Sequence, residues 1–101
     1  MMDKRKFYIN GQWVSPSKPN DYEVINPSTE EAFATISLGS TEDTNAAVSA
    51  AKKALVSWSE SSKDERLNLL EKLLSIYKKR YGEMADAISM EMGAPMDWAT
   101  D

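Results

Sequence analysis

The first third of the chain carries short aromatic and β-branched runs separated by turn residues, a pattern that predicts strands. Phe7-Tyr8-Ile9 and Trp13-Val14 lie on either side of Asn10-Gly11. Asn-Gly is the dipeptide best suited to the positive φ angles of a two-residue type I′ turn. We therefore predict a β-hairpin over residues 7–14.

A second pair of strands is predicted directly afterwards. Tyr22 to Ile25 forms one strand, and residues 32–38 form the other, in which small or apolar side chains alternate with polar ones apart from Phe33. The intervening segment Asn26-Pro27-Ser28-Thr29-Glu30 has the composition of a turn, and its proline cannot extend a strand ladder. Gly39 ends this second hairpin.

From residue 40 onward the apolar positions recur with helical spacing. Ser40 or Thr41 is placed to cap a first helix, whose acidic residues Glu42 and Asp43 fall where the helix dipole favours negative charge. The face predicted to be buried is rich in alanine, which favours close approach to a neighbour. It comprises Ala47, Ala51, Ala54 and Trp58, flanked by Val48 and Leu55.

Three further helix signals follow. Ser62 and Glu65 have the spacing of a capping box, which predicts the start of a second helix. A third helix is expected from about Glu83 to Met92, with Gly93 as its C-terminal cap, and Pro95 is placed to open another. The apolar face of the second helix consists of Leu67, Leu70, Leu73, Leu74, Tyr77 and Tyr81.

Composition and charge exclude several classes of protein. The net charge of −4 and the acidic pI of about 4.8 argue against a nucleic-acid partner, because that binding needs a basic face. The 101 residues include no cysteine and no histidine, which removes disulfides, thiol chemistry and the commonest zinc ligand. No apolar run is long enough to cross a membrane, and the charged start has no signal-like stretch behind it. We expect a cytoplasmic protein.

Several segments, taken in order, resemble the NAD(P)-dependent aldehyde dehydrogenase superfamily. Residues 8–13, Tyr-Ile-Asn-Gly-Gln-Trp, are similar to its first hairpin. Residues 24–31 are similar to its "V-x-N-P-[AS]-T-G-E" turn, with Glu30 standing where glycine is usual. Residues 91–95, Glu-Met-Gly-Ala-Pro, resemble a bacterial subgroup. Each motif alone is weak, but together they cover nearly the whole chain.

The resemblance implies a fold class and a division into domains. The chain would be an α+β piece, with two N-terminal β-hairpins followed by three to four α-helices, of a larger α/β enzyme with a Rossmann-like coenzyme domain. Residues 1–101 would form the N-terminal part of that coenzyme-binding domain, with hairpins over 1–39 and a helical layer over 40–101. The partners implied are the remainder of the same enzyme and further copies, as a homodimer or homotetramer.

The resemblance also implies a chemistry that this segment lacks. Family members oxidise an aldehyde with NAD or NADP through a thioester on a cysteine, and the thiolate is the required nucleophile. The chain has no cysteine, and its four glycines are isolated from one another rather than grouped in a phosphate-binding loop. We therefore assign no catalytic and no cofactor-binding residue to this chain, which should be inactive alone.

One binding role carries over from the family. Many members bind a monovalent cation through backbone carbonyls just before the Asn-Pro turn, and the matching positions here are Val24 and Ile25. Carbonyl oxygens suit a hard cation, although the other ligands would lie outside this segment. The plainer interpretation, favoured for the chain alone, is two ordinary strand residues.

A second function class stays open from the sequence. The chain could be a self-sufficient α+β interaction module, in which a helical hairpin presents leucine and tyrosine to a partner protein. The family motifs favour the first interpretation, an aldehyde dehydrogenase segment. That interpretation also predicts exposed apolar surface, because the alanine-rich helix face is suited to pack against a neighbouring part of the enzyme.

Overall fold

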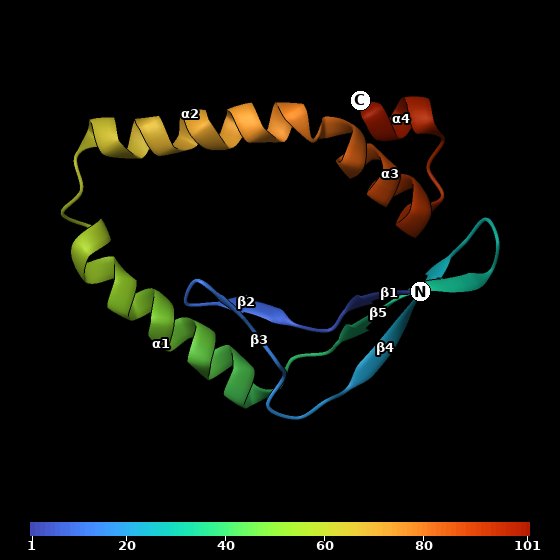
Figure 1. The fold of residues 1–101 in the computed structure, drawn as a ribbon, viewed down its shortest axis with the longest axis horizontal. Helices are drawn as coiled ribbons and strands as arrows, with labels where there is room; N and C mark the ends of the chain where they lie inside the picture. The colour runs from blue at the N-terminus through green and yellow to red at the C-terminus, as the bar shows by residue number, and fades with distance from the viewer. The chain divides into compact units, whose positions relative to one another are not determined.

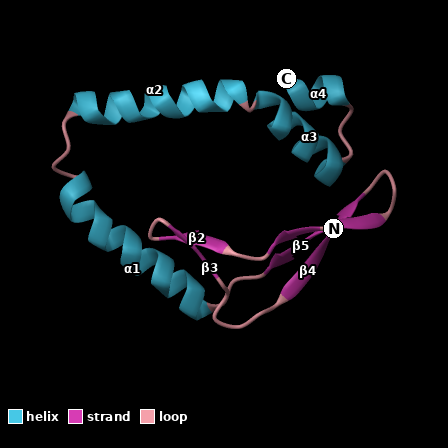
Figure 2. Ribbon diagram, viewed as in Figure 1, coloured by secondary structure: helices cyan, strands magenta, loops and turns pink.

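The computed structural model describes all residues 1–101, and its strands precede its helices (Figure 1; Figure 2). The predicted α+β class is confirmed. The strands are β1 (Met2–Lys4), β2 (Phe7–Ile9), β3 (Gln12–Val14), β4 (Asp21–Asn26) and β5 (Glu31–Ser37). The helices are α1 (Thr41–Trp58), α2 (Lys63–Lys79), α3 (Tyr81–Met92) and α4 (Met96–Thr100).

The first predicted hairpin is present as the antiparallel pair β2–β3. Asn10 and Gly11 form its turn with φ angles of 55° and 76°, as a type I′ turn requires. Tyr8 is registered opposite Trp13, and their ring centroids lie 5.1 Å apart. This cross-strand aromatic pair adds to the local stability that the Asn-Gly turn provides.

The remaining strands form a three-stranded sheet in the order β1-β5-β4. Strands β4 and β5 are hydrogen-bonded neighbours joined by four residues, a connection too short for a parallel pair, so the second predicted hairpin is confirmed. Strand β1 was not predicted. It pairs in parallel with β5, placing Met2 opposite Ala34, a pairing between distant segments that local sequence pattern does not reveal.

The chain divides into two compact units. The first contains residues 1–25 and 32–60, and the second contains residues 26–31 and 61–101. Helix α1 therefore belongs with the strands, and the β4–β5 turn belongs with the later helices. A division at residue 39 separates strands from helices along the sequence, but it does not coincide with these units.

In the first unit, α1 runs beside the β2–β3 hairpin (Figure 1). The hairpin tip at Asn10-Gly11 and the alanine-rich face of α1 line a shallow hollow of about 330 Å³. The alanine stripe thus faces a neighbour, as predicted. Its side chains nevertheless remain exposed, so the prediction that this face is buried is wrong for the chain by itself.

In the second unit, the predicted capping box of α2 and the predicted C-terminal cap of α3 are confirmed. Ser62 and Glu65 form the capping box of α2. Helix α3 begins at Tyr81, earlier than predicted, because Gly82 is accommodated within its first turn. Gly93 caps α3 in the left-handed conformation, and a further helix, α4, follows Pro95 and packs on α3.

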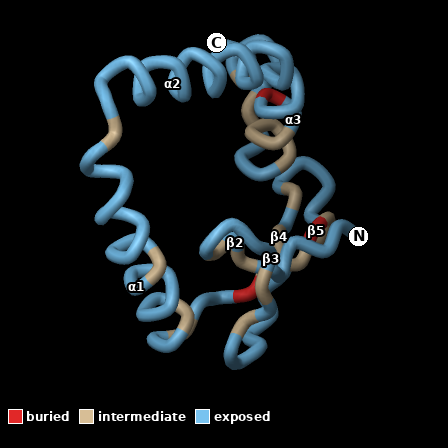
Figure 3. Tube along the Cα trace, turned by 60° about the vertical axis from the view of Figure 1, so that its left-hand side comes forward, coloured by how far each residue is buried: buried red, intermediate tan, exposed pale blue.

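Few residues are buried (Figure 3). Only Ala34, Ser37 and Ala85 are buried. The leucine-rich face predicted to point inward from α2 is exposed, with Leu70 at 61% and Leu73 at 60%. The prediction failed because the second unit contains just two further helices, which do not cover this face.

The glycine within α3, Gly82, and the glycine that caps it, Gly93, give opposite predictions. Gly93→Ala should lower the free energy of unfolding by at least about 1–2 kcal/mol, because φ is 74° there. Its new Cβ would also lie 3.0 Å from Pro27 Cγ. Gly82→Ala, in open space within the helix, should raise stability by up to about 1 kcal/mol. Urea unfolding followed by circular dichroism measures both, and shifts of the same sign would contradict this account.

Candidate functional site

The two candidate cation ligands lie on β4, at an edge of the three-stranded sheet. The Val24 side chain is half-buried and that of Ile25 is exposed. Because β5 lies along just one side of β4, the other side of the strand presents backbone groups that no strand pairs. The position therefore offers carbonyl oxygens to a ligand outside the sheet.

The direction of each carbonyl follows from the pairing of β4 with β5. Asn20, directly before β4, accepts a hydrogen bond through its carbonyl from the Leu38 amide at 2.9 Å. Carbonyls alternate in direction along a strand, so the Val24 carbonyl points toward β5 and the Ile25 carbonyl points to the open edge. The two oxygens do not converge within the regular strand, and Ile25 is the better placed ligand.

The turn after β4 is held by its own side chains. The Asn26 side-chain oxygen accepts a hydrogen bond from the Ser28 amide at 2.9 Å, and the Asn26 carbonyl accepts one from the Glu30 amide at 2.8 Å. Glu30 adopts a φ of 61°. A left-handed residue at this position explains why glycine is usual there in the resembling turn, since glycine adopts it without steric cost.

This turn lies against the C-terminal cap of α3. A Cβ built on Gly93 would be 3.0 Å from Pro27 Cγ and 3.9 Å from Ser28 Oγ, so the two backbones approach closely. The turn residues 26–31 and the segment 91–95, which belong to two motifs that the sequence analysis treated separately, are therefore neighbours within the second unit. The close contact supplies a physical reason for glycine at position 93 beyond its φ angle.

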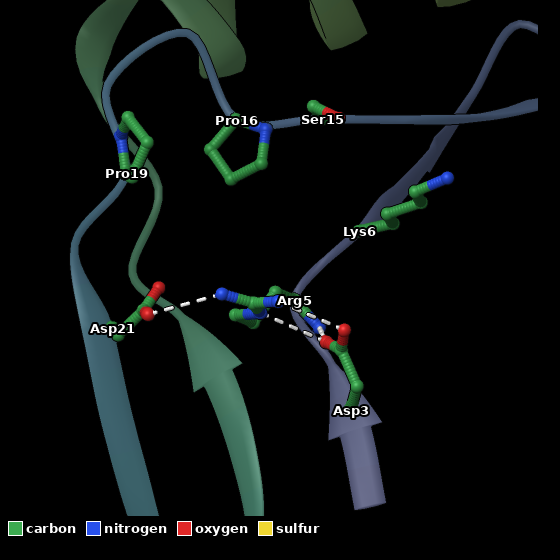
Figure 4. A pocket seen from close by; sticks show the side chains of 7 residues that line it. All are labelled: Asp3, Arg5, Lys6, Ser15, Pro16, Pro19 and Asp21. Carbon is green, nitrogen blue, oxygen red and sulfur yellow. Dashed lines mark hydrogen bonds and ion pairs between the residues drawn. The ribbon is translucent and has the colours of Figure 1, made fainter.

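A cluster of charged side chains links the end of β1 to the start of β4 (Figure 4). The Arg5 guanidinium donates to both carboxylate oxygens of Asp3, at 2.9 and 3.0 Å, and to Asp21 at 3.3 Å. Pro16 and Pro19 line the same shallow hollow of about 230 Å³. This cluster was not predicted, because it depends on the unpredicted strand β1.

The ion pairs of the cluster shift the pKa values of their members. Hydrogen bonds from the Arg5 side chain and then from its backbone amide lower the pKa of Asp3 from 3.8 to about 2. The pKa of Arg5 is raised, first by its hydrogen bond to Asp3. Because the guanidinium is engaged by two carboxylates, it is poorly suited to bind an anionic ligand.

The strand–glycine–helix junction from β5 to α1 is the one place where the topology resembles a phosphate-binding loop. It contains the single glycine Gly39. The Asp43 carboxylate accepts hydrogen bonds from the backbone amides of Ser40 and Ser17, each at 3.0 Å. These bonds lower the pKa of Asp43, that from Ser40 most. A carboxylate already occupies this helix start, so the junction does not fit the pyrophosphate of a dinucleotide.

No group of three or more acidic, histidine or cysteine side chains is placed to hold a metal ion. Besides Asp3 and Asp43, Glu83 also has a lowered pKa. The main cause is the hydrogen bond that its carboxylate accepts from Arg80. A general acid that acts near neutral pH needs a raised pKa instead. None of the helices is long and apolar enough to span a membrane.

Comparison with known proteins identifies relatives along most of the chain. The model of the "Aldehyde dehydrogenase family" matches residues 13–101. A 3-succinoylsemialdehyde-pyridine dehydrogenase from a Pseudomonas species is 49% identical over 96 residues, which are 95% of this chain and 20% of that protein. A putative aldehyde dehydrogenase from Staphylococcus epidermidis is 42% identical over 96 residues, with the same coverage.

Solved structures agree with this match. The crystal structure of an aldehyde dehydrogenase from Bartonella henselae is similar with a TM-score of 0.97 and 60% identity, covering 99% of this chain and 21% of that one. A mutant aldehyde dehydrogenase C from Pseudomonas syringae, solved with NAD+ and octanal, has a TM-score of 0.93 and 40% identity, covering 95% and 20%. The chain spans about a fifth of the length of these relatives and corresponds to their N-terminal segment.

The left-handed residue of the β4–β5 turn generates a prediction with an adjacent control. Glu30→Gly should stabilise the chain by up to about 1 kcal/mol, because it removes the cost of a positive φ at a residue with a Cβ. Glu31→Gly, in the extended backbone of β5, should destabilise it by about 0.5–1 kcal/mol. Urea unfolding of both variants checks this, and a destabilised Glu30→Gly protein would overturn the interpretation of the turn.

The Arg5 cluster predicts a measurable titration. In Arg5→Ala the pKa of Asp3 should rise from about 2 toward 3.8, whereas Lys4→Ala should leave it nearly unchanged. The native shift is downward, so its stabilising contribution is present above pH 3.8 and is lost as the pH falls toward 2. Carboxyl NMR titration reads the pKa directly. An Asp3 that titrates near 3.8 in the unaltered chain would show that the ion pair does not form in solution.

Proposed function

The chain belongs to the aldehyde dehydrogenase family, and we propose that it is the N-terminal segment of an enzyme that oxidises an aldehyde to a carboxylic acid with NAD(P)+. The family match over residues 13–101 carries the proposal. A relative at 40% identity was crystallised with NAD+ and the aldehyde octanal, which supports both the cofactor and the substrate class. The proposal concerns the longer protein, since this chain contains no cysteine.

Within that enzyme the segment is a scaffold. We assign residues 1–101 to the N-terminal part of the coenzyme-binding domain, with hairpins over 1–39 and helices over 40–101. The shared contact between the β4–β5 turn and Gly93 supports a structural role, because it joins two stretches characteristic of the family at a place with no reactive side chain. Nucleophile, base and coenzyme-binding groups would all come from other parts of the enzyme.

The coenzyme, NAD or NADP, is accordingly assigned to residues outside this segment. The start of α1 is capped by Ser40 and occupied by the Asp43 carboxylate, an arrangement that disfavours a phosphate at that point. The proposed enzyme is a cytoplasmic homodimer or homotetramer, whose segment contacts the remainder of its own polypeptide.

A monovalent cation is proposed beside β4. Its ligands would be the backbone carbonyls of Val24 and Ile25, completed by groups outside the segment. The open edge of β4 supports Ile25 as the principal ligand of the two. Contribution by Val24 requires its carbonyl to turn away from β5.

An activity assay tests the proposed function. The full-length protein, given NAD+ or NADP+ and a panel of aliphatic and aromatic aldehydes, should produce reduced nicotinamide, followed by its absorbance. The 101-residue chain should produce none, because it lacks a thiol nucleophile. Prior alkylation with iodoacetamide should abolish turnover by the full-length protein. If intact, folded full-length protein reduces neither coenzyme with any aldehyde, the proposal fails and a non-catalytic α+β interaction module becomes the explanation.

A further inference from the structure

A small hollow lies beside the end of β1 and strand β3, within the first unit. It has a volume of about 390 Å³, and Asp3, Lys4, Lys6 and Trp13 line it. That volume is in the range of small-molecule sites, which combine an apolar or aromatic surface with a few charged groups. Here the indole of Trp13 supplies the aromatic surface and the two lysines supply positive charge. The proposed function gives this hollow no role.

The lysine charges of the hollow are not neutralised by its carboxylate. Arg5 donates hydrogen bonds to both carboxylate oxygens of Asp3, at 2.9 and 3.0 Å. Neither Lys4 nor Lys6 forms an ion pair with an acidic side chain. The side chain of Lys6 points away from Asp21, which is bound by Arg5 (Figure 4). Two ammonium groups are therefore free to bind a phosphate or a carboxylate.

This positive charge is confined to the start of the chain. Residues 1–19 contain four basic side chains and one acidic side chain, which gives a net charge of +3. The whole chain has a net charge of −4, so residues 20–101 carry −7. A small anion is therefore attracted to the segment that forms the hollow and repelled by the rest of the chain.

The indole of Trp13 is available for stacking and is held in place from one side. Trp13 is 67% exposed. Tyr8 lies opposite it in the β2–β3 hairpin, with ring centroids 5.1 Å apart and ring planes inclined by 57°. This contact restricts the indole before a ligand arrives, so less side-chain freedom is lost on binding. Flat aromatic rings stack favourably on such a surface.

We propose that this hollow binds a planar aromatic anion, whose ring stacks on Trp13 and whose phosphate or carboxylate group lies between Lys4 and Lys6. The hollow matches both parts of such a ligand, since its ammonium groups and its indole line one small volume. An anionic membrane surface would need the same groups on a face that reaches the lipid, and a hollow does not provide one. The inference goes beyond the proposed function and does not depend on it.

Fluorine NMR of the full-length protein, labelled with fluorotryptophan, tests the proposal. The resonance of Trp13 is identified by its loss in Trp13→Phe, or in Trp13→Tyr if the phenylalanine variant does not fold. The probes are naphthoate and adenosine monophosphate, each titrated in the presence of saturating NAD+. We expect a saturable shift of the Trp13 resonance with at least one probe, and the tighter binder identifies the anionic group. Adenosine and naphthalene methanol, which lack the negative charge, should bind at least about tenfold more weakly.

Lysine substitutions separate the hollow from the general charge of the segment. Lys4→Gln combined with Lys6→Gln should weaken binding of the responding probe at least about tenfold, because both ammonium groups are removed. Lys18→Gln is the matched control. Its ammonium is paired with Glu42 at 3.7 Å and does not line the hollow, so binding should change less than about twofold.

Three results would overturn the proposal. The first is a Trp13 resonance that neither probe shifts at millimolar concentration. The second is equal binding by the double lysine variant and the unaltered protein. The third is a protein that ignores both probes but sediments with vesicles of phosphatidylcholine and phosphatidylserine, which would assign the basic residues to a membrane surface. None of these measurements requires turnover, so an inactive full-length protein would refute the proposed function and leave this result readable.

Discussion

The serine hydroxyls at the starts of α1 and α2 accept hydrogen bonds from backbone amides that otherwise have no partner in the helix. The carboxylates of Asp43 and Glu65 in turn accept hydrogen bonds from the backbone amides of Ser40 and Ser62. With so few side chains buried, these local closures do much to fix where each helix begins. The starts of these two helices therefore rest on short-range hydrogen bonds, while the apolar faces of α1 and α2 remain exposed.

This distribution explains what could be predicted from the sequence. The Asn10-Gly11 turn, the Ser62 capping box and the Gly93 cap depend on a few consecutive residues, and all three were predicted correctly. Strand β1 and the Arg5 cluster depend on residues far apart in the chain, and no local pattern marks them. The helix faces were recognised as apolar, but burial depends on contacts between distant residues, and the faces predicted to be buried in α1 and α2 are exposed.

The family relationship and the absence of chemistry have different physical origins. The motifs shared with the family lie in turns and helix caps. Positive φ angles and close backbone approach restrict the choice of residue there, as at Gly93, which lies against Pro27. The expectation that the segment holds no catalytic residue rests instead on composition, because the sequence contains no cysteine. A segment can thus be identified with an enzyme family through the geometry of its turns and caps alone. Of the candidate cation ligands, the sequence located the strand, but the sheet pairing was needed to separate Ile25 from Val24.

The parallel pairing of β1 with β5 has a consequence for the order of events during synthesis. Met2 leaves the ribosome well before Ala34, the residue that it faces in the sheet. The two hairpins between them are closed by short connections and can form as soon as they emerge, because local contacts need little loop closure. Strand β1 must instead wait, unpaired, until β5 has been made. Strand β1, although it is made before β5, is therefore among the last parts of the sheet to pair.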